Sequence, residues 1–161
     1  MHKTTLAVGA ALSLLFIASA CSHSRTIKTQ DGSVTVEQGK NGANSSLHAE
    51  GKDGTSLDIN TGKAITDYPT DVPLYSGKST MDMKSGEKHA RTVILQTPDS
   101  IGKISDFYKS ELESKGWKVE TTLTTERMAM YKASKDNREM VVQIGTDNGQ
   151  QSTISQTIAD K

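Results

Sequence analysis

Residues 90–117, ARTVILQTPDSIGKISDFYKSELESKGW, decide the fold class because they join a strand pattern to a helix pattern. Ala90–Gln96 is apolar and rich in β-branched residues, which predicts a buried strand. A helix is expected to follow, with Thr97 as its cap and Pro98 in the first helical position. Gly116 is the expected stop, since glycine is common just past a helix C-terminus.

The predicted helix carries one apolar stripe. Its large apolar residues recur at intervals of three and four, as expected for a helix that packs by one face: Ile101, Ile104, Phe107, Tyr108 and Leu112. Trp117, directly after the helix, should close the seam between the helix and a sheet.

Four strand patterns follow this helix: Trp117–Thr124, Arg127–Ala133, Glu139–Thr146 and Ser152–Ile158. Polar turn residues at 135–137 and 147–149 separate the later ones and make neighbouring strands antiparallel. The sequence therefore predicts an α+β fold, in which one helix packs on an antiparallel sheet of about four to five strands.

Residues 22–66 differ in composition, because they contain no proline and no aromatic residue. Short alternating runs predict strands around Val34, Leu47 and Leu57, with turns at Asp31-Gly32, Asn41-Gly42 and Asp53-Gly54. This segment is either a short glycine-rich β-meander that docks on the rest of the chain or a flexible spacer that lifts the domain from a membrane. The pattern leaves both open.

The N-terminus has the features of a secretory signal: a positive start, the apolar run Leu6–Ile17 and the small residues Ala18-Ser19-Ala20. The run is shorter than the roughly 20 residues of a membrane span. With Cys21 directly after it, the segment resembles the lipobox of bacterial lipoproteins. The alternative is an ordinary signal that leaves Cys21 as a free thiol.

The lipobox resemblance implies removal of residues 1–20 and a diacylglycerol group on Cys21. The expected organisation is a signal peptide (1–20), an anchor with a spacer or meander (21–66) and an α+β domain (67–161). Ser22 follows the cysteine, where Asp would favour the inner membrane. We therefore expect the outer membrane, with the domain facing the periplasm.

A second resemblance concerns the stretch FYKSELESKGW (Phe107–Trp117), preceded by PTDVPLYSG (Pro69–Gly77). Over roughly Asp67–Ile158 the chain resembles a domain of small, uncharacterised bacterial envelope proteins with an F-Y-x-x-x-L-x-x-x-G-W helix end. The resemblance implies a fold and carries no activity.

The composition argues against several function classes. The chain has 19 basic and 19 acidic residues, so it has no electrostatic footprint for nucleic acid. Cys21 is the single cysteine, and the histidines lack metal-ligand spacing. No catalytic motif is present. We expect no enzyme, no metal and no cofactor beyond the lipid.

Two functions remain. The main hypothesis is a non-catalytic protein-binding or assembly-accessory module, whose surface would include Tyr68, Tyr75, Met128, Met130 and Met140. The competing hypothesis is a carrier or sensor of a small apolar ligand held between helix and sheet, in a cavity lined by Met128, Met130, Met140, Ile104 and Tyr108. Alternatively, the methionines fill gaps under the helix, and the tyrosines and prolines at 68–75 pin the two halves of the chain together.

Overall fold

The computed structural model describes residues 23–39, 44–146 and 150–161. The expected signal peptide, Cys21 and Ser22 lie outside the described residues, as do the predicted turns at Asn41-Gly42 and 147–149. Within the described ranges, no helix is both long and apolar enough to cross a membrane.

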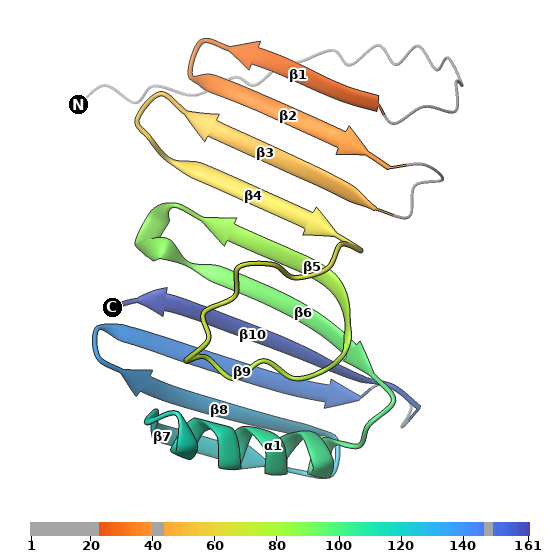
Figure 1. Ribbon diagram of the computed structural model, residues 1–161, viewed down its shortest axis with the longest axis vertical. Coiled ribbons are helices and arrows are strands. Elements are labelled where there is room, and N and C mark those ends of the chain that lie inside the picture. Colours follow the sequence, from red (N-terminus) through yellow and green to blue (C-terminus); the bar gives the residue numbers. More distant parts are fainter. Residues whose placement is uncertain (1–22, 40–43, 147–149) are drawn as a thin grey trace, which may run out of the picture.

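The described residues form one antiparallel sheet of ten strands, in the order β1-β2-β3-β4-β5-β6-β10-β9-β8-β7 (Figure 1). The other elements in the described ranges are the helix α1 (Ile101–Ser114) and a short 3-10 turn, η2 (Glu87–His89). The strands are β1 His23–Thr29, β2 Gly32–Gln38, β3 Ser45–Gly51, β4 Ser56–Thr61, β5 Lys78–Ser85, β6 Arg91–Thr97, β7 Lys118–Thr124, β8 Met128–Lys135, β9 Arg138–Thr146 and β10 Ser152–Asp160.

The predicted fold class, a helix on four to five strands behind a separate meander or spacer, is wrong. The strands β1–β4 continue the same sheet, because β4 pairs with β5 from Leu57 opposite Ser85 to Thr61 opposite Met81. The joining strand β5 (Lys78–Ser85) lies outside every strand predicted from the sequence. Hydrogen bonding between β4 and β5 turns two predicted parts into one layer.

The helix has the predicted stripe but begins later than predicted. Its N-cap is Ser100, whose side chain accepts a hydrogen bond from the Lys103 amide, whereas Thr97 is the last residue of β6. The predicted end is confirmed. Gly116 has a φ of +74°, and the Trp117 amide donates to the Leu112 carbonyl at 2.8 Å, which closes the last turn.

Helix α1 and residues 62–77 cover one face of the sheet, which we call the front face (Figure 1). Between them and β6, β8, β9 and β10 lies the core, where Ile104, Tyr108 and Leu112 are fully buried. Gln156 of β10 forms hydrogen bonds that connect the sheet to α1 and to residues 62–77. It accepts a hydrogen bond from the Tyr108 hydroxyl (2.7 Å) and donates to the Tyr68 hydroxyl (2.8 Å) and the Pro73 carbonyl (2.7 Å).

The strands β1–β5 direct their apolar side chains to the opposite, back face, because Asp82 pairs with the buried Val93 and so faces the front. The apolar residues form two rows of directly paired positions. One row is Val36, Leu47, Ile59 and Met83, and the other is Ile27, Val34, Ala49 and Leu57. We call these eight side chains the apolar band.

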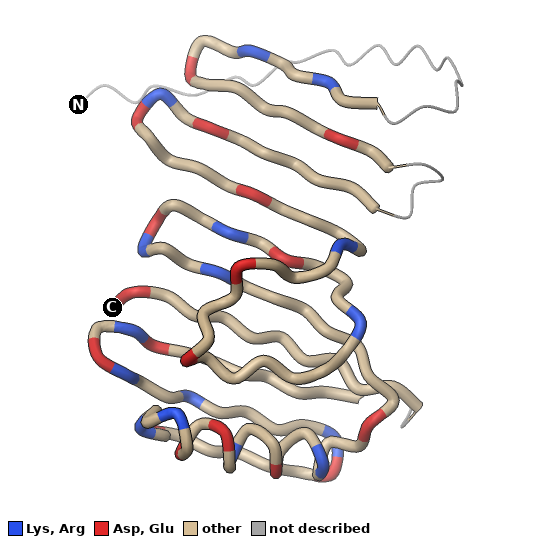
Figure 2. The backbone as a smooth tube through the Cα atoms, in the orientation of Figure 1, with Lys and Arg blue, Asp and Glu red and all other residues tan. Residues whose placement is uncertain are grey.

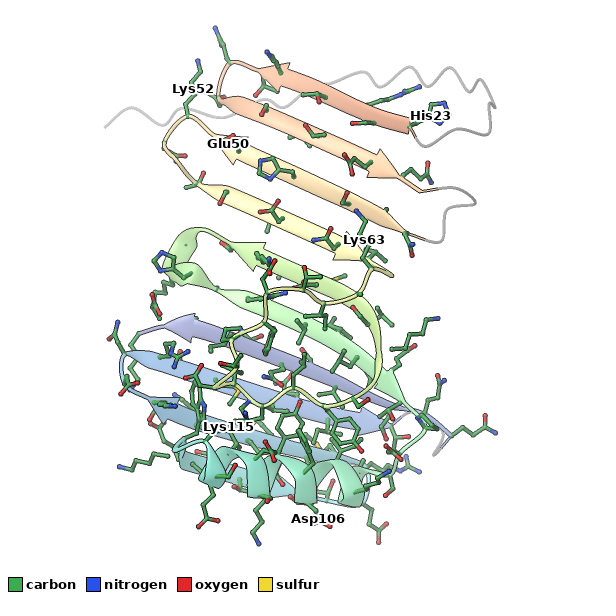
Figure 3. All side chains as sticks on the ribbon, in the orientation of Figure 1. His23, Glu50, Lys52, Lys63, Asp106 and Lys115 are labelled. Carbon is green, nitrogen blue, oxygen red and sulfur yellow. The ribbon has the colours of Figure 1, made fainter. Side chains whose placement is uncertain are left out.

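Side chains crowd the front face between α1, residues 62–77 and the C-terminal strands, but are sparse over β1–β4 (Figure 3). Lysines, arginines and acidic residues are interspersed along the backbone, without a large region of one sign (Figure 2).

Candidate functional site

A hollow of about 400 Å³ lies on the front face, where residues 67–69 pass the ends of four strands. It is lined by residues from β5, the turn after η2, β6, β9 and β10: Asp67, Pro69, Lys84, Ser85, His89, Ala90, Arg91, Arg138, Ile158, Ala159 and Asp160. This size falls within the range of small-molecule sites. We call it the hollow.

Apolar atoms form much of the hollow's wall. Ile158 is 5% exposed and pairs with Arg91 on one side and Met140 on the other, so it belongs to the core-facing row of the sheet. Pro69 and Ala90 add apolar surface. The chain reaches Ala90 through Lys88 and His89, both with positive φ, which turn it back from β5 into β6.

Arg91 is buried beside Asp82, and its guanidinium donates hydrogen bonds to that carboxylate and to two backbone carbonyls. Its Nε and Nη2 donate to the two carboxylate oxygens of Asp82 at 2.8 and 2.6 Å. Nη2 and Nη1 also donate to the carbonyls of Thr66 (2.7 Å) and Asp67 (2.9 Å), and the guanidinium lies 4.9 Å from the centre of the Tyr68 ring. The pair is a neutral unit that fastens residues 66–68 to the sheet.

Two further basic side chains of the hollow, His89 and Arg138, are also paired. His89 Nδ1 lies 2.7 Å from an Asp160 carboxylate oxygen, and Arg138 donates to both carboxylate oxygens of Asp71. The hydrogen bond from Arg138 lowers the pKa of Asp71 to about 2, with Lys135 at 3.2 Å adding to the effect. These pairs hold the rim of the hollow in place.

Lys84 and Asp67 differ from these pairs. Within the described part of the chain, neither side chain forms a hydrogen bond or an ion pair. Lys84 sits between Asp58 on β4 and Arg91 on β6, but Asp58 lies 2.5 Å from His48 Nδ1 instead. The rim therefore offers a ligand the Lys84 ammonium as a charged donor and the Asp67 carboxylate as a charged acceptor.

This arrangement can bind a small molecule with an apolar body and a polar end. Apolar walls contribute non-directional affinity, while a few polar groups fix orientation. In the described residues, no group of three or more His, Cys, Asp or Glu side chains is placed to hold a metal ion.

The structure brings together only some of the residues predicted for a binding site. Tyr75 and Met140 are buried in the core, with the Tyr75 hydroxyl donating to Asp99 at 2.7 Å, and Tyr68 packs under Arg91. Met128 and Met130 instead lie on the back face, because their neighbours Ala129 and Tyr131 face the core. The five residues of the predicted helix–sheet cavity therefore do not line one space.

The residues of the hollow were not identified from the sequence, because Arg91 was treated as part of an apolar strand. Arg91 stands in the apolar strand ARTVILQ, on the same face as Val93 and Leu95, which are buried. A charged residue at a core-facing position of a buried strand signals a buried partner. That signal could have identified the Arg91–Asp82 pair, although not Pro69 or Ile158.

A family model described as START domain-like matches residues 78–153, from β5 to the start of β10. This stretch of the chain resembles a START domain. The match covers just under half of the chain. It includes Lys84, Arg91 and Arg138 of the hollow, but not Asp67 or the C-terminal end of β10. The similarity points towards a ligand-binding type of domain. Neither a curated protein nor a solved structure matches the chain.

Proposed function

We propose that the chain is a lipid-anchored protein of the bacterial cell envelope whose sheet domain binds a small ligand without catalysis. The observation that carries the ligand part is the hollow, with its apolar wall and two unpaired charged groups on the rim. The START domain-like similarity supports the same class of function, since it spans three of the hollow's charged residues.

The anchoring part rests on the signal-like residues 1–20 and on Cys21. Lipidation of Cys21 would attach two or three acyl chains, and more than one chain is needed for stable membrane binding. Strand β1 begins at His23, so the sheet would start two residues from the anchor. Ser22 supports the outer membrane, with the domain in the periplasm. Labelling cells with an alkyne-bearing palmitate should mark the parent chain and leave Cys21→Ser unmarked.

The ligand would lay its apolar body against Pro69, Ala90 and Ile158, with its polar end at Lys84 and Asp67. This position differs from the expected space between helix and sheet. There, Ile104, Tyr108 and Met140 are closed off in the core. The hollow instead opens beside that core, at the ends of β5, β6, β9 and β10.

The dye 8-anilinonaphthalene-1-sulfonate is a suitable probe, because it combines an apolar body with an anionic group. We expect saturable binding, detected by dye fluorescence, to the chain carrying Cys21→Ser. Ala90→Trp would fill the hollow and reduce the affinity at least tenfold, whereas Lys84→Gln would weaken it several-fold by removing the cation.

The matched control for this experiment is Val36→Ser, which removes exposed apolar surface on the back face and leaves the hollow intact. Its dye binding should equal that of the parent. If Ala90→Trp binds the dye as the parent does, while Val36→Ser loses binding, then the hollow is not the site and the ligand proposal fails.

A protein-binding module is the second candidate function. The observation that favours it is the apolar band, in which Ile27 is 60% and Val36 is 41% exposed. Contiguous apolar patches on a protein surface often mark sites of contact with another molecule. This candidate needs no ligand in the hollow, so the two can be tested separately.

A further inference from the structure

The apolar band is an organised surface of the sheet. The strand register produces the band, because Val36 pairs with Leu47 and Leu47 pairs with Ile59. Directly paired residues share a face, so all three side chains lie on the back face. Such direct pairing places the side chains about 5 Å apart across the strands, close enough for them to touch. The band is therefore continuous from β1 to β5.

Charged residues are almost absent from this part of the back face. The alternation of β2, β3 and β4 sends their ionisable side chains, among them Glu37, His48 and Asp58, to the front. Arg25 of the edge strand β1, paired with Val36, is the exception at the border of the band. An uncharged surface can meet an identical surface without like-charge repulsion.

Nothing in the described residues lies over the band. Helix α1 and residues 62–77 are both on the front face, and the described ranges contain no helix that packs on β1–β4 (Figure 1). The side chains of the band are all partly or largely exposed, whereas the front face of the C-terminal strands is buried. The apolar surface thus has no partner among the residues that the structure describes.

We infer that the occupant of the apolar band is a second copy of this chain, packed back face to back face about a twofold axis. This inference deepens the protein-binding candidate and does not depend on ligand binding in the hollow. Two sheets pack best when their twists match, at an angle of about −30° between strand directions. A second copy supplies a sheet of identical twist and an identical uncharged band.

The size of the band agrees with such a contact. Strands lie about 4.8 Å apart and same-face residues about 6.8 Å apart, so each side chain covers about 33 Å² and the eight cover about 260 Å². Eight uncharged neighbours on the same face, at about 33 Å² each, bring the contribution of each copy to about 530 Å². They are Gln38, Ser45, Thr61, Met81, Ser85, Thr92, Ile94 and Gln96. The total of about 1,000–1,200 Å² reaches the lower end of specific interfaces.

An interface of this size predicts a dimer that dissociates on dilution. Anchoring of both copies in one membrane would favour it, because confinement raises their effective concentration. The contact would also remove the Ile27 and Val36 side chains from water, the two most exposed apolar residues of the band.

The first test is sedimentation velocity of the chain carrying Cys21→Ser over a wide concentration range. We expect a monomer–dimer equilibrium in the parent. Leu47→Lys, at the centre of the band, should raise the dimer dissociation constant at least tenfold. Met130→Lys is the matched control, because it places the same charge on the back face but on β8, outside the band. It should leave the dimer unchanged.

If Leu47→Lys does not fold, cysteine cross-linking provides a second test of whether two copies meet at the apolar band. In the Cys21→Ser background, Leu47→Cys gives a chain with a single cysteine in the band, and His48→Cys places it on the front face one residue away. We expect a disulfide-linked dimer from Leu47→Cys and little from His48→Cys. A parent that stays monomeric, a dimer that survives Leu47→Lys, or equal cross-linking of both cysteines would overturn the inference. Dye binding in the hollow would be unaffected by any of these results.

Discussion

The two halves of the sheet contain similar alternating strands but differ in what covers them. In the C-terminal half, α1 and residues 62–77 bury one side of every central strand, and Val142 and Ile154 are fully buried. In the N-terminal half, the described residues contain no covering element, and the apolar side of β1–β4 remains partly open. Alternation specifies which side chains share a face, whereas burial depends on a second layer supplied by another part of the chain.

This difference implies unequal stability along one continuous sheet. The C-terminal half has its own core, which includes Tyr108, Leu112 and Trp117. The two N-terminal hairpins have only neighbouring strands to pair with, and a hairpin alone is marginally stable in water. Their order therefore depends on the pairing of β4 with β5 and on the anchoring of β5 in the covered half.

The largest effect is expected at the junction of the halves, where Asp82 of β5 meets Arg91 of β6. Arg91→Met would leave the Asp82 carboxylate buried without its partner, and removing one member of a buried pair costs about 3–5 kcal/mol. Urea unfolding measures the loss. The double variant Asp82→Leu/Arg91→Met should recover much of it. A single variant within about 1 kcal/mol of the parent would show that the pair is not buried in solution.

A matched pair of leucine truncations compares the halves directly. Leu112→Ala removes a fully buried side chain from the core and should lower the free energy of unfolding by about 2–5 kcal/mol. Leu47→Ala makes the same change in the apolar band, where the side chain is only partly buried, and should cost about 1 kcal/mol or less in the monomer. Urea unfolding at high dilution measures both. Equal losses would mean that the band is covered.

Local patterns predicted many elements and few of their long-range partners. The helix stripe, its end at Gly116 and the strands after it lie close to the predicted positions, because each depends on residues near in sequence. The alternating pairs at Val34, Leu47 and Leu57 also fall on strands β2, β3 and β4. Pairing of β4 with β5 crosses a long connection, and no local pattern specifies it. The count of four to five strands failed for that reason.

The candidate site was harder to predict than the fold. The hollow collects Pro69, Lys84, Arg91 and Ile158 from segments far apart in sequence, and it exists only once residues 62–77 cross the sheet. Methionine counting pointed to Met128 and Met130, because composition does not tell which face of a strand a residue occupies. Alternation along β8 groups Ala129 with Tyr131 and Met128 with Met130, but only the second layer of the structure determines that Ala129 and Tyr131 face the core.

A smaller effect is expected at Asp71, which fastens residues 62–77 to the covered half. Hydrogen bonds from Arg138 lower the pKa of Asp71 to about 2, below its usual 3.8. A lowered carboxyl pKa adds stability above the ordinary pKa, and this contribution is lost as the pH falls towards 2. The carboxylate is partly exposed, so solvent screening limits the gain to about 1 kcal/mol or less. The stability difference between the parent and Asp71→Asn should shrink from pH 5 to pH 2. A constant difference would show that the ion pair is not responsible.

The smallest effect belongs to the open half, where His48 of β3 faces Asp58 of β4. The hydrogen bond that the Asp58 carboxylate accepts from the His48 ring raises the pKa of His48 above 6.5, and Glu50, 4.0 Å from Nε2, adds to the rise. A raised histidine pKa stabilises the fold fully below pH 6.5 and less as the pH rises through the folded value. Because the pair is exposed, its contribution to stability is small, but proton NMR titration of His48 detects it directly. Asp58→Asn should return the pKa towards 6.5, and Glu50→Gln should change it less. A His48 pKa at or below 6.5 that does not change in Asp58→Asn would mean that β3 and β4 do not keep this register. The ordered part of the sheet would then be limited to the half that α1 and residues 62–77 cover.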